Sequence, residues 1–271
     1  MVKAVPPAQL RGNAAPVVQH LVVRYAKRGK MRFASHRDVA RAFERGVRRA
    51  GLPIAYSAGF TPHPKISYAG GAPTGVASEA EYLTLGLTSV QVANEVSSRL
   101  NAMLPDGIDV VDVTEELPGS SAPEASSWRV ELPGVRPEAA ARAVAGFLAR
   151  TEAPVERLTD KGVRQLDARG AVAEMAVVTP GPSGGDGQRA AIASGPDCAI
   201  LRMVVLHQAP AVRPEDVLTA LRPGHGIVPS SPPLTTRLAQ GRLAEVQGLT
   251  GESSVSPSVG TLQVSPGKTV S

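Results

Sequence analysis

The sequence contains one cysteine, Cys198, and only 3% aromatic residues. A single thiol excludes an internal disulfide, and it excludes a zinc or iron–sulfur site built from the chain's own cysteines, because each of these needs several thiolates. Cys198 begins an apolar run and is interpreted as a small buried hydrophobic residue rather than a nucleophile. With so few aromatics, the core must consist mainly of valine, leucine, isoleucine and alanine.

Long apolar runs and a signal-peptide pattern are also missing. No run approaches the roughly 20 residues that a membrane helix needs, and Met1–Gln19 lacks the pattern of a secretory leader. Together with the single cysteine, this predicts a cytoplasmic protein. The length of 271 residues, with 42% hydrophobic residues, is enough for two domains with their own cores.

Lysine is scarce among the basic residues, since six of the 29 are lysine and the others are arginine. Arginine binds phosphate bidentately and stacks on bases better than lysine does, although a GC-rich genome would also favour arginine codons. The distribution is more informative than the number. Ten basic and two acidic residues lie between Leu21 and Ala50, so this short stretch carries more positive charge than the +5 of the whole chain.

The apolar pattern predicts an α+β fold. In the first half we expect the order β-α-β-β-α-β, with strands at 21–25, 66–69, 82–87 and 108–114 and helices at 35–50 and 89–104. This order is typical of a ferredoxin-like unit, in which two helices pack on one face of an antiparallel sheet. The second half repeats the pattern more loosely, with its last strand at 234–243, so we predict tandem ferredoxin-like units.

Composition predicts the boundaries of these units. Stretches rich in Pro, Ala, Ser or Gly are typical of disordered or linking segments. We expect a disordered leader at 1–17, a basic domain at 18–115, a linker at 116–127, a second domain at 128–243 with a mobile insertion at 181–195, and a disordered tail at 244–271.

The clearest single element is the helix at 35–50. Ser35 with Asp38 three residues later forms an acidic variant of the capping box. Gly51 is placed to end the helix. The core-facing stripe has helical spacing and consists of Val39, Phe43, Val47 and Ala50.

Arginines recur at the same spacing away from this stripe. Clustered like charges destabilise a helix unless something offsets them, and RNA phosphates would do so, with counterion release favouring binding. We predict that the phosphate-binding residues are Lys30, Arg32, Arg37, Arg41, Arg45 and Arg48. The alternatives are a solvated basic face and a face paired with acids of the second half.

The loop that follows the helix is a second candidate. Pro62 and Pro64 stiffen it on either side of His63. We predict that Phe60, His63 and Lys65 contact a nucleotide. In the alternative interpretation, Phe60 fills the core and His63 caps a strand.

His36 is the candidate catalytic residue. It falls in the first turn of the helix, where an imidazole could serve as general acid or base in RNA cleavage, or could simply hydrogen-bond at the helix start. A metal site is not predicted, because no ligand spacing links His36 with His63. The glycine-rich segment at 70–75 lacks the ending of a phosphate loop, and Glu79 and Glu81 are interpreted as surface residues.

Two stretches carry a family resemblance. Arg-Phe-Ala-Ser-His-Arg-Asp at 32–38 and the segment at 45–67 resemble the radical SAM-associated domain of unknown function. The resemblance is detailed over residues 20–115 and weaker through 155–162, 166–169 and 213–218. The family usually has leucine where Arg37 stands. Because radical SAM chemistry needs three cysteines on an iron–sulfur cluster, the resemblance implies an accessory to a separate radical SAM enzyme, with no cofactor of its own.

Three functional hypotheses follow. The first is an RNA-binding accessory of a separate radical SAM enzyme, with tRNA or rRNA as the partner. The second is a metal-independent endoribonuclease that uses His36, by architectural likeness to the CRISPR repeat-processing endoribonucleases. The third is an interaction module whose basic face docks an acidic protein.

Overall fold

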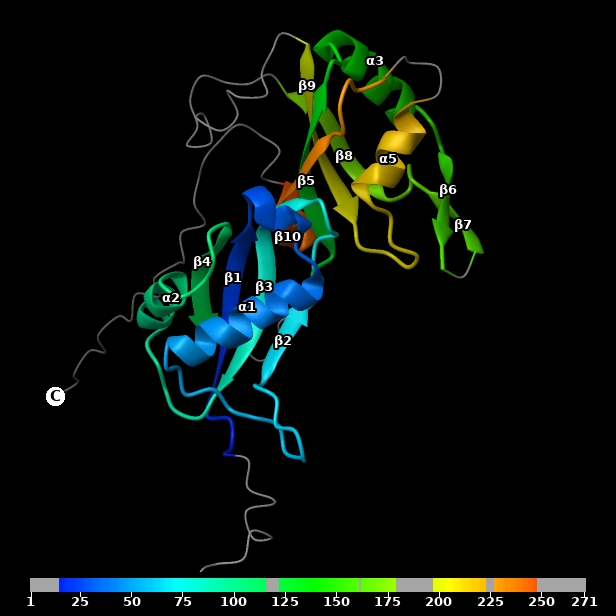
Figure 1. The fold of residues 1–271 in the computed structure, drawn as a ribbon. Coiled ribbons are helices and arrows are strands. Elements are labelled where there is room, and N and C mark those ends of the chain that lie inside the picture. The colour runs from blue at the N-terminus through cyan, green and yellow to red at the C-terminus, as the bar shows by residue number, and fades with distance from the viewer. Residues whose placement is uncertain (1–14, 116–121, 161, 179–196, 223–226, 248–271) are drawn as a thin grey trace, which may run out of the picture.

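The computed structural model describes residues 15–115, 122–160, 162–178, 197–222 and 227–247 (Figure 1). The first half forms β1 (Gln19–Lys27), a short 3-10 helix η2 (Gly29–Phe33), α1 (His36–Arg49), β2 (Ile66–Ala69), β3 (Ala77–Leu87), α2 (Ala93–Asn101) and β4 (Ile108–Glu115). The second half forms β5 (Ala125–Pro133), α3 (Pro137–Leu148), β6 (Pro154–Thr159), β7 (Gly162–Asp167), β8 (Val172–Val178), β9 (Cys198–Leu206), α5 (Pro214–Leu221), β10 (Leu234–Gly241) and α6 (Leu243–Gln247).

Strands of both halves share one eight-stranded sheet. Its order is β4-β1-β3-β10-β5-β9-β8, and β2 pairs with β3 beside this path. The strands pair in antiparallel fashion except at the junction of the halves, where β10 runs parallel to β3 with Arg237 opposite Ser78. The predicted α+β class is therefore confirmed. The strands of the two halves form one mostly antiparallel sheet, whereas antiparallel sheets in separate units were predicted.

Each half places its own strands in the same relative order. The spatial order is β4-β1-β3-β2 in the first half and β10-β5-β9-β8 in the second. In both halves the strand that comes last in the chain lies beside the strand that comes first. The third strand of each half lies between the first and the second. The hairpin β6–β7 lies between α3 and β8 in the chain and forms a separate two-stranded sheet. The description of the halves as tandem ferredoxin-like units stays a prediction.

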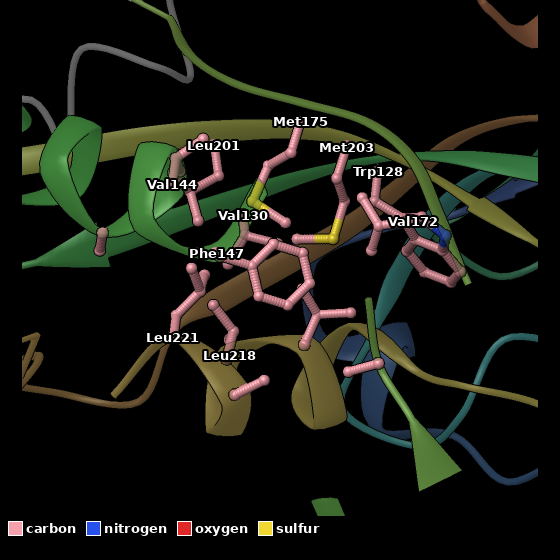
Figure 2. Close-up of a cluster of buried hydrophobic side chains, with 14 of the residues drawn as sticks. Trp128, Val130, Val144, Phe147, Val172, Met175, Leu201, Met203, Leu218 and Leu221 are labelled. Atoms are coloured by element: carbon pink, nitrogen blue, oxygen red, sulfur yellow. The ribbon is translucent and has the colours of Figure 1, made fainter. Parts of the chain in front are cut away.

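Two apolar clusters form the main cores. In the first half, α1 and α2 lie over one face of the sheet (Figure 1), and Phe43 packs edge-on against Tyr25. In the second half, Phe147 of α3 packs with Leu218 and Leu221 of α5 and with methionines of the sheet (Figure 2). Most of the buried side chains are aliphatic, as the scarcity of aromatics predicts.

Several expected boundaries need correction. β5 begins at Ala125, inside the expected linker, because Ala125, Ser126 and Ser127 are buried and pair with β9. Residue 244 does not begin a disordered tail: α6 continues to Gln247 and buries Val246 against β5 and β9. The strand expected to close the sheet, β10, lies at its centre, between β3 and β5. Residues 1–14 of the expected leader, residues 116–121 of the expected linker, the insertion at 181–195 and residues 248–271 of the expected tail lie outside the described residues.

The structure also tests the interpretation of the single cysteine. Cys198 is 8% exposed, so its interpretation as a buried small residue is confirmed. Among the five α-helices of the described segments, none is long and apolar enough to cross a membrane.

Candidate nucleic-acid interface

The helix α1 begins and ends where the local signals place it. The Ser35 hydroxyl accepts the Asp38 backbone N–H at 3.2 Å, and the Asp38 carboxylate accepts the Ser35 backbone N–H, which completes the capping box. The Ser35 hydroxyl also donates to the Asp38 carboxylate at 2.6 Å. This hydrogen bond, then the one from the Ser35 backbone N–H, and less strongly the nearby Arg41 and Arg37, lower the pKa of Asp38. After Arg49 the chain turns at Gly51, whose φ of +60° suits glycine.

One face of α1 is basic and exposed. Three residues of the predicted stripe, Val39, Phe43 and Val47, are buried against the sheet, and the fourth, Ala50, is half-buried against the same core. The arginines of the helix lie outside this stripe. The exposed arginines of the helix are Arg37, Arg41, Arg45, Arg48 and Arg49. We call these five side chains the arginine face.

The acids of α1 do not neutralise the arginine face. Asp38 is committed to the cap, and Glu44 is half-buried. The Glu44 carboxylate is near Tyr68, where it adds to the effect of burial in raising the pKa of that phenol. Within the described segments, no carboxylate lies within 4.0 Å of any nitrogen of the arginine face. Five positive charges therefore face solvent with two acids on the same helix.

Lys27, the last residue of β1, and Arg28, which follows it, do not join this face. Lys27 is 3% exposed and lies inside the molecule. Arg28 forms ion pairs with Glu79 and with Asp109, the latter at 2.9 Å. Glu79, whose side chain is 32% exposed, is thus a partly exposed acid that is paired with Arg28.

Lys30 and Arg32 lie in η2, between β1 and α1. Lys30 is exposed, and Arg32 is half-buried with its guanidinium 4.6 Å from the ring centre of Phe33. Phe33 itself is 60% exposed. The sequence reasoning missed Phe33, although an aromatic residue among basic residues is a signal for base stacking.

The loop between α1 and β2 presents the other predicted residues. Phe60 is 89% exposed, so the alternative in which it fills the core is wrong. His63 is exposed; its backbone N–H donates to the Ser57 hydroxyl, and its carbonyl accepts the Ser57 backbone N–H. Lys65 is exposed and directly precedes β2. The short pairing of Tyr56 with Pro64 closes the base of this loop.

His36 and His63 lie at opposite ends of β2. The His36 ring contacts Tyr68 edge-on, with ring centres 5.1 Å apart, whereas His63 precedes the amino end of the strand. The described residues contain no group of three potential metal ligands among His, Cys, Asp and Glu. The structure does not bring these two histidines together.

His36 instead lies at the edge of a pocket of about 200 Å³. Tyr25 and Lys27 come to it from β1, and Glu81 comes from β3. Gly71 and Ala72 contribute the segment that follows β2, and Val39 of α1 adds an apolar wall. Glu81 is 2% exposed, so its interpretation as a surface residue is wrong.

Charged residues at inward-facing strand positions could have indicated this pocket from the sequence. Leu21, Val23 and Tyr25 of β1 are buried, and Lys27 continues that buried set. A lysine or glutamate at such a position is rarely buried unless it has a partner or a task. The partner of Glu81, Arg237, comes from the far end of the chain.

Comparison with protein families gives a match over most of the chain. The family model described as "Uncharacterized protein conserved in bacteria (DUF2344)" matches residues 20–214. The matched segment spans η2, α1, the loop at 57–65 and the β1 and β3 residues of the pocket. No curated protein matches the chain. The family description mentions neither RNA nor a radical SAM enzyme.

Proposed function

The chain belongs to the DUF2344 family, and we propose that it is an RNA-binding protein that presents RNA to a separate radical SAM enzyme. The arginine face carries the RNA part of this proposal. It extends from Arg37 to Arg49, about 18 Å along the helix axis at 1.5 Å per residue, which is long enough to contact several phosphates of one strand.

Two exposed aromatics favour RNA over an acidic protein as the partner. Phe33 lies next to the start of α1, and Phe60 lies in the loop after it. Unpaired bases stack on aromatic rings and on guanidinium planes, and arginine binds phosphate through two parallel hydrogen bonds. An acidic protein would need the arginines but would not need two exposed rings.

The radical SAM part of the proposal depends on the sequence resemblance alone. The single cysteine of this chain cannot hold the cluster which that chemistry requires. We therefore assign the chain the binding step and assign the reaction to another protein. We also propose that both halves are ferredoxin-like units, the second with the β6–β7 hairpin inserted, because their strand orders agree.

Fluorescence anisotropy with labelled tRNA and rRNA fragments tests the RNA proposal. The test variant replaces three residues of the arginine face, Arg41, Arg45 and Arg48, by glutamine. We expect it to bind at least about tenfold more weakly than the wild type, because three phosphate contacts are lost. The matched control replaces three exposed arginines of the second half by glutamine: Arg136, Arg142 and Arg164.

An equal loss in both triple variants would show unspecific attraction by net charge, and no binding by the wild type would refute the proposal. RNA cleavage in EDTA that disappears in His36→Ala would instead support the endoribonuclease hypothesis. Capture of an acidic protein after nuclease treatment, without RNA binding, would support the docking hypothesis.

A further inference from the structure

Three charged side chains meet inside the molecule where β1, β3 and β10 lie side by side. They are Lys27, Glu81 and Arg237, with exposed fractions of 3%, 2% and 7%. Two cations therefore share one carboxylate in a region with little water. An unbalanced buried charge is unfavourable, so a bound anion would balance the excess positive charge of these three side chains.

The hydrogen bonds identify Lys27 as the cation left over. Glu81 Oε1 accepts from Arg237 Nη1 at 3.2 Å, and Glu81 Oε2 accepts from the Ala72 N–H at 2.9 Å. Arg237 Nη1 also donates to the Gly70 carbonyl at 2.7 Å. The carboxylate thus has its counter-ion and a second donor, and no ion pair joins it to Lys27 among the described residues.

Lys27 donates from Nζ to the carbonyl oxygens of Ala72 and Pro73, at 3.2 and 3.4 Å. An ammonium has three N–H groups, so one is left for a ligand in the pocket. The hydroxyl of Tyr25, which is 4% exposed, has no hydrogen-bond partner in the described part of the chain. His36 adds an imidazole at the first residue of α1, where the helix end is positive.

The pocket thus presents donors, and its single acidic group is already paired. The volume of about 200 Å³ is enough for one small oxyanion. We propose that the pocket binds one tetrahedral oxyanion, a phosphate group, with Lys27 as its charge partner and Tyr25 and His36 as further donors.

This site is separate from the arginine face and does not depend on the proposed function. Calorimetric titration of the full chain with sodium phosphate tests it, with sodium chloride at matched ionic strength as the reference. We expect one phosphate per chain, and binding at least about tenfold weaker in Lys27→Met, because a charge-assisted hydrogen bond is lost. Arg142→Met, on the exposed surface of α3, is the matched control and should bind as the wild type does.

Gly71→Val tests the same site without removing a charge. A Cβ at Gly71 would lie 3.6 Å from His36 Nδ1 and 3.7 Å from Glu81 Oε2, which are ordinary contacts, so the fold tolerates the branch point while the side chain enters the pocket. We expect phosphate binding to be lost in this variant with an unchanged near-UV circular dichroism spectrum. If Lys27→Met alone failed to fold, phosphate binding by Gly71→Val would still test the site.

Two RNA oligonucleotides that differ only in a terminal phosphate identify the source of the group. Tighter binding of the phosphorylated strand by the wild type but not by Gly71→Val would assign the pocket to an RNA end; equal binding would assign it to a free phosphate compound. No phosphate binding by the wild type, or binding that persists in both pocket variants, would overturn the proposal, and RNA binding through the arginine face could still stand.

Discussion

Replacing one member of the Arg237–Glu81 pair tests the charge balance at the junction of the two halves. Arg237→Met removes the ion pair, the hydrogen bond to the Gly70 carbonyl and the cation–π contact with Trp128, whose ring centre is 4.9 Å away. Glu81→Gln keeps an acceptor for the Ala72 N–H, but it leaves Lys27 and Arg237 without any negative partner.

The two substitutions should therefore lower the free energy of unfolding by different amounts. Removing one member of a buried pair costs about 3–5 kcal/mol of unfolding free energy. After Arg237→Met, the charge of Lys27 still attracts Glu81 although no ion pair joins them among the described residues, so we expect a loss near the lower end, about 3 kcal/mol. After Glu81→Gln two buried cations remain together, so we expect about 4–5 kcal/mol. The double variant Arg237→Met/Glu81→Gln leaves Lys27 alone and should lose less than the sum of the single losses.

Urea denaturation at pH 7, followed by far-UV circular dichroism, measures these losses. The fluorescence of Trp128 alone is unsuitable because Arg237 lies over its ring. The control is Arg142→Met on the surface of α3, which should change the stability by about 0.5 kcal/mol or less. Losses under 1 kcal/mol for both single variants, or a milder effect of Glu81→Gln, would refute this account of the buried charges.

Three further results are expected. Burial, and then the Glu131 charge, raise the pKa of Cys198, so a thiol reagent should modify it slowly in the native protein and quickly in urea; fast native labelling would contradict its burial. Burial lowers the pKa of His207 below its usual 6.5. In the unfolded protein His207 then binds its proton at a higher pH than in the folded protein, so the free energy of unfolding should fall as the pH drops below 6.5. The fall should be smaller in His207→Gln, and equal pH profiles of the two proteins would exclude this cause. Burial also lowers the pKa of Lys27, with Arg237 acting in the same direction and Glu81 against it, so sulfate, whose charge is constant, should bind more weakly as the pH rises toward 10.5. Lys27→Met should lack that decline, and a wild-type profile that is flat up to pH 10.5 would contradict it.

The sequence predicted α1 well because its determinants are local. Ser35 and Asp38 form the cap, Phe43 lies on the buried stripe, and Gly51 ends the helix, all within 17 residues. The outward direction of the arginines follows from the same periodicity. The exposed positions of Phe60 and Lys65 agree with the predicted nucleotide loop, although their contact with RNA stays a prediction.

The pocket could not be predicted because its partners are distant in the chain. Arg237 and Glu81 are 156 residues apart, and the parallel pairing of β10 with β3 brings them together. Arg28 was also misjudged because its partners are distant in the chain. It resembled part of a basic surface, yet it is paired with Glu79 and Asp109, which are 51 and 81 residues away. A count of local charge cannot include such partners.

The salt dependence of RNA binding tests the central claim most directly. Each phosphate contact contributes about 0.7 to the slope of log K against log salt for a single strand. Replacement of Arg41, Arg45 and Arg48 by glutamine should therefore reduce the wild-type slope by about 2, while the control with Arg136, Arg142 and Arg164 replaced keeps it. A wild-type slope near zero, or the same slope in the wild type and the α1 variant, would contradict the assignment of the arginine face to RNA.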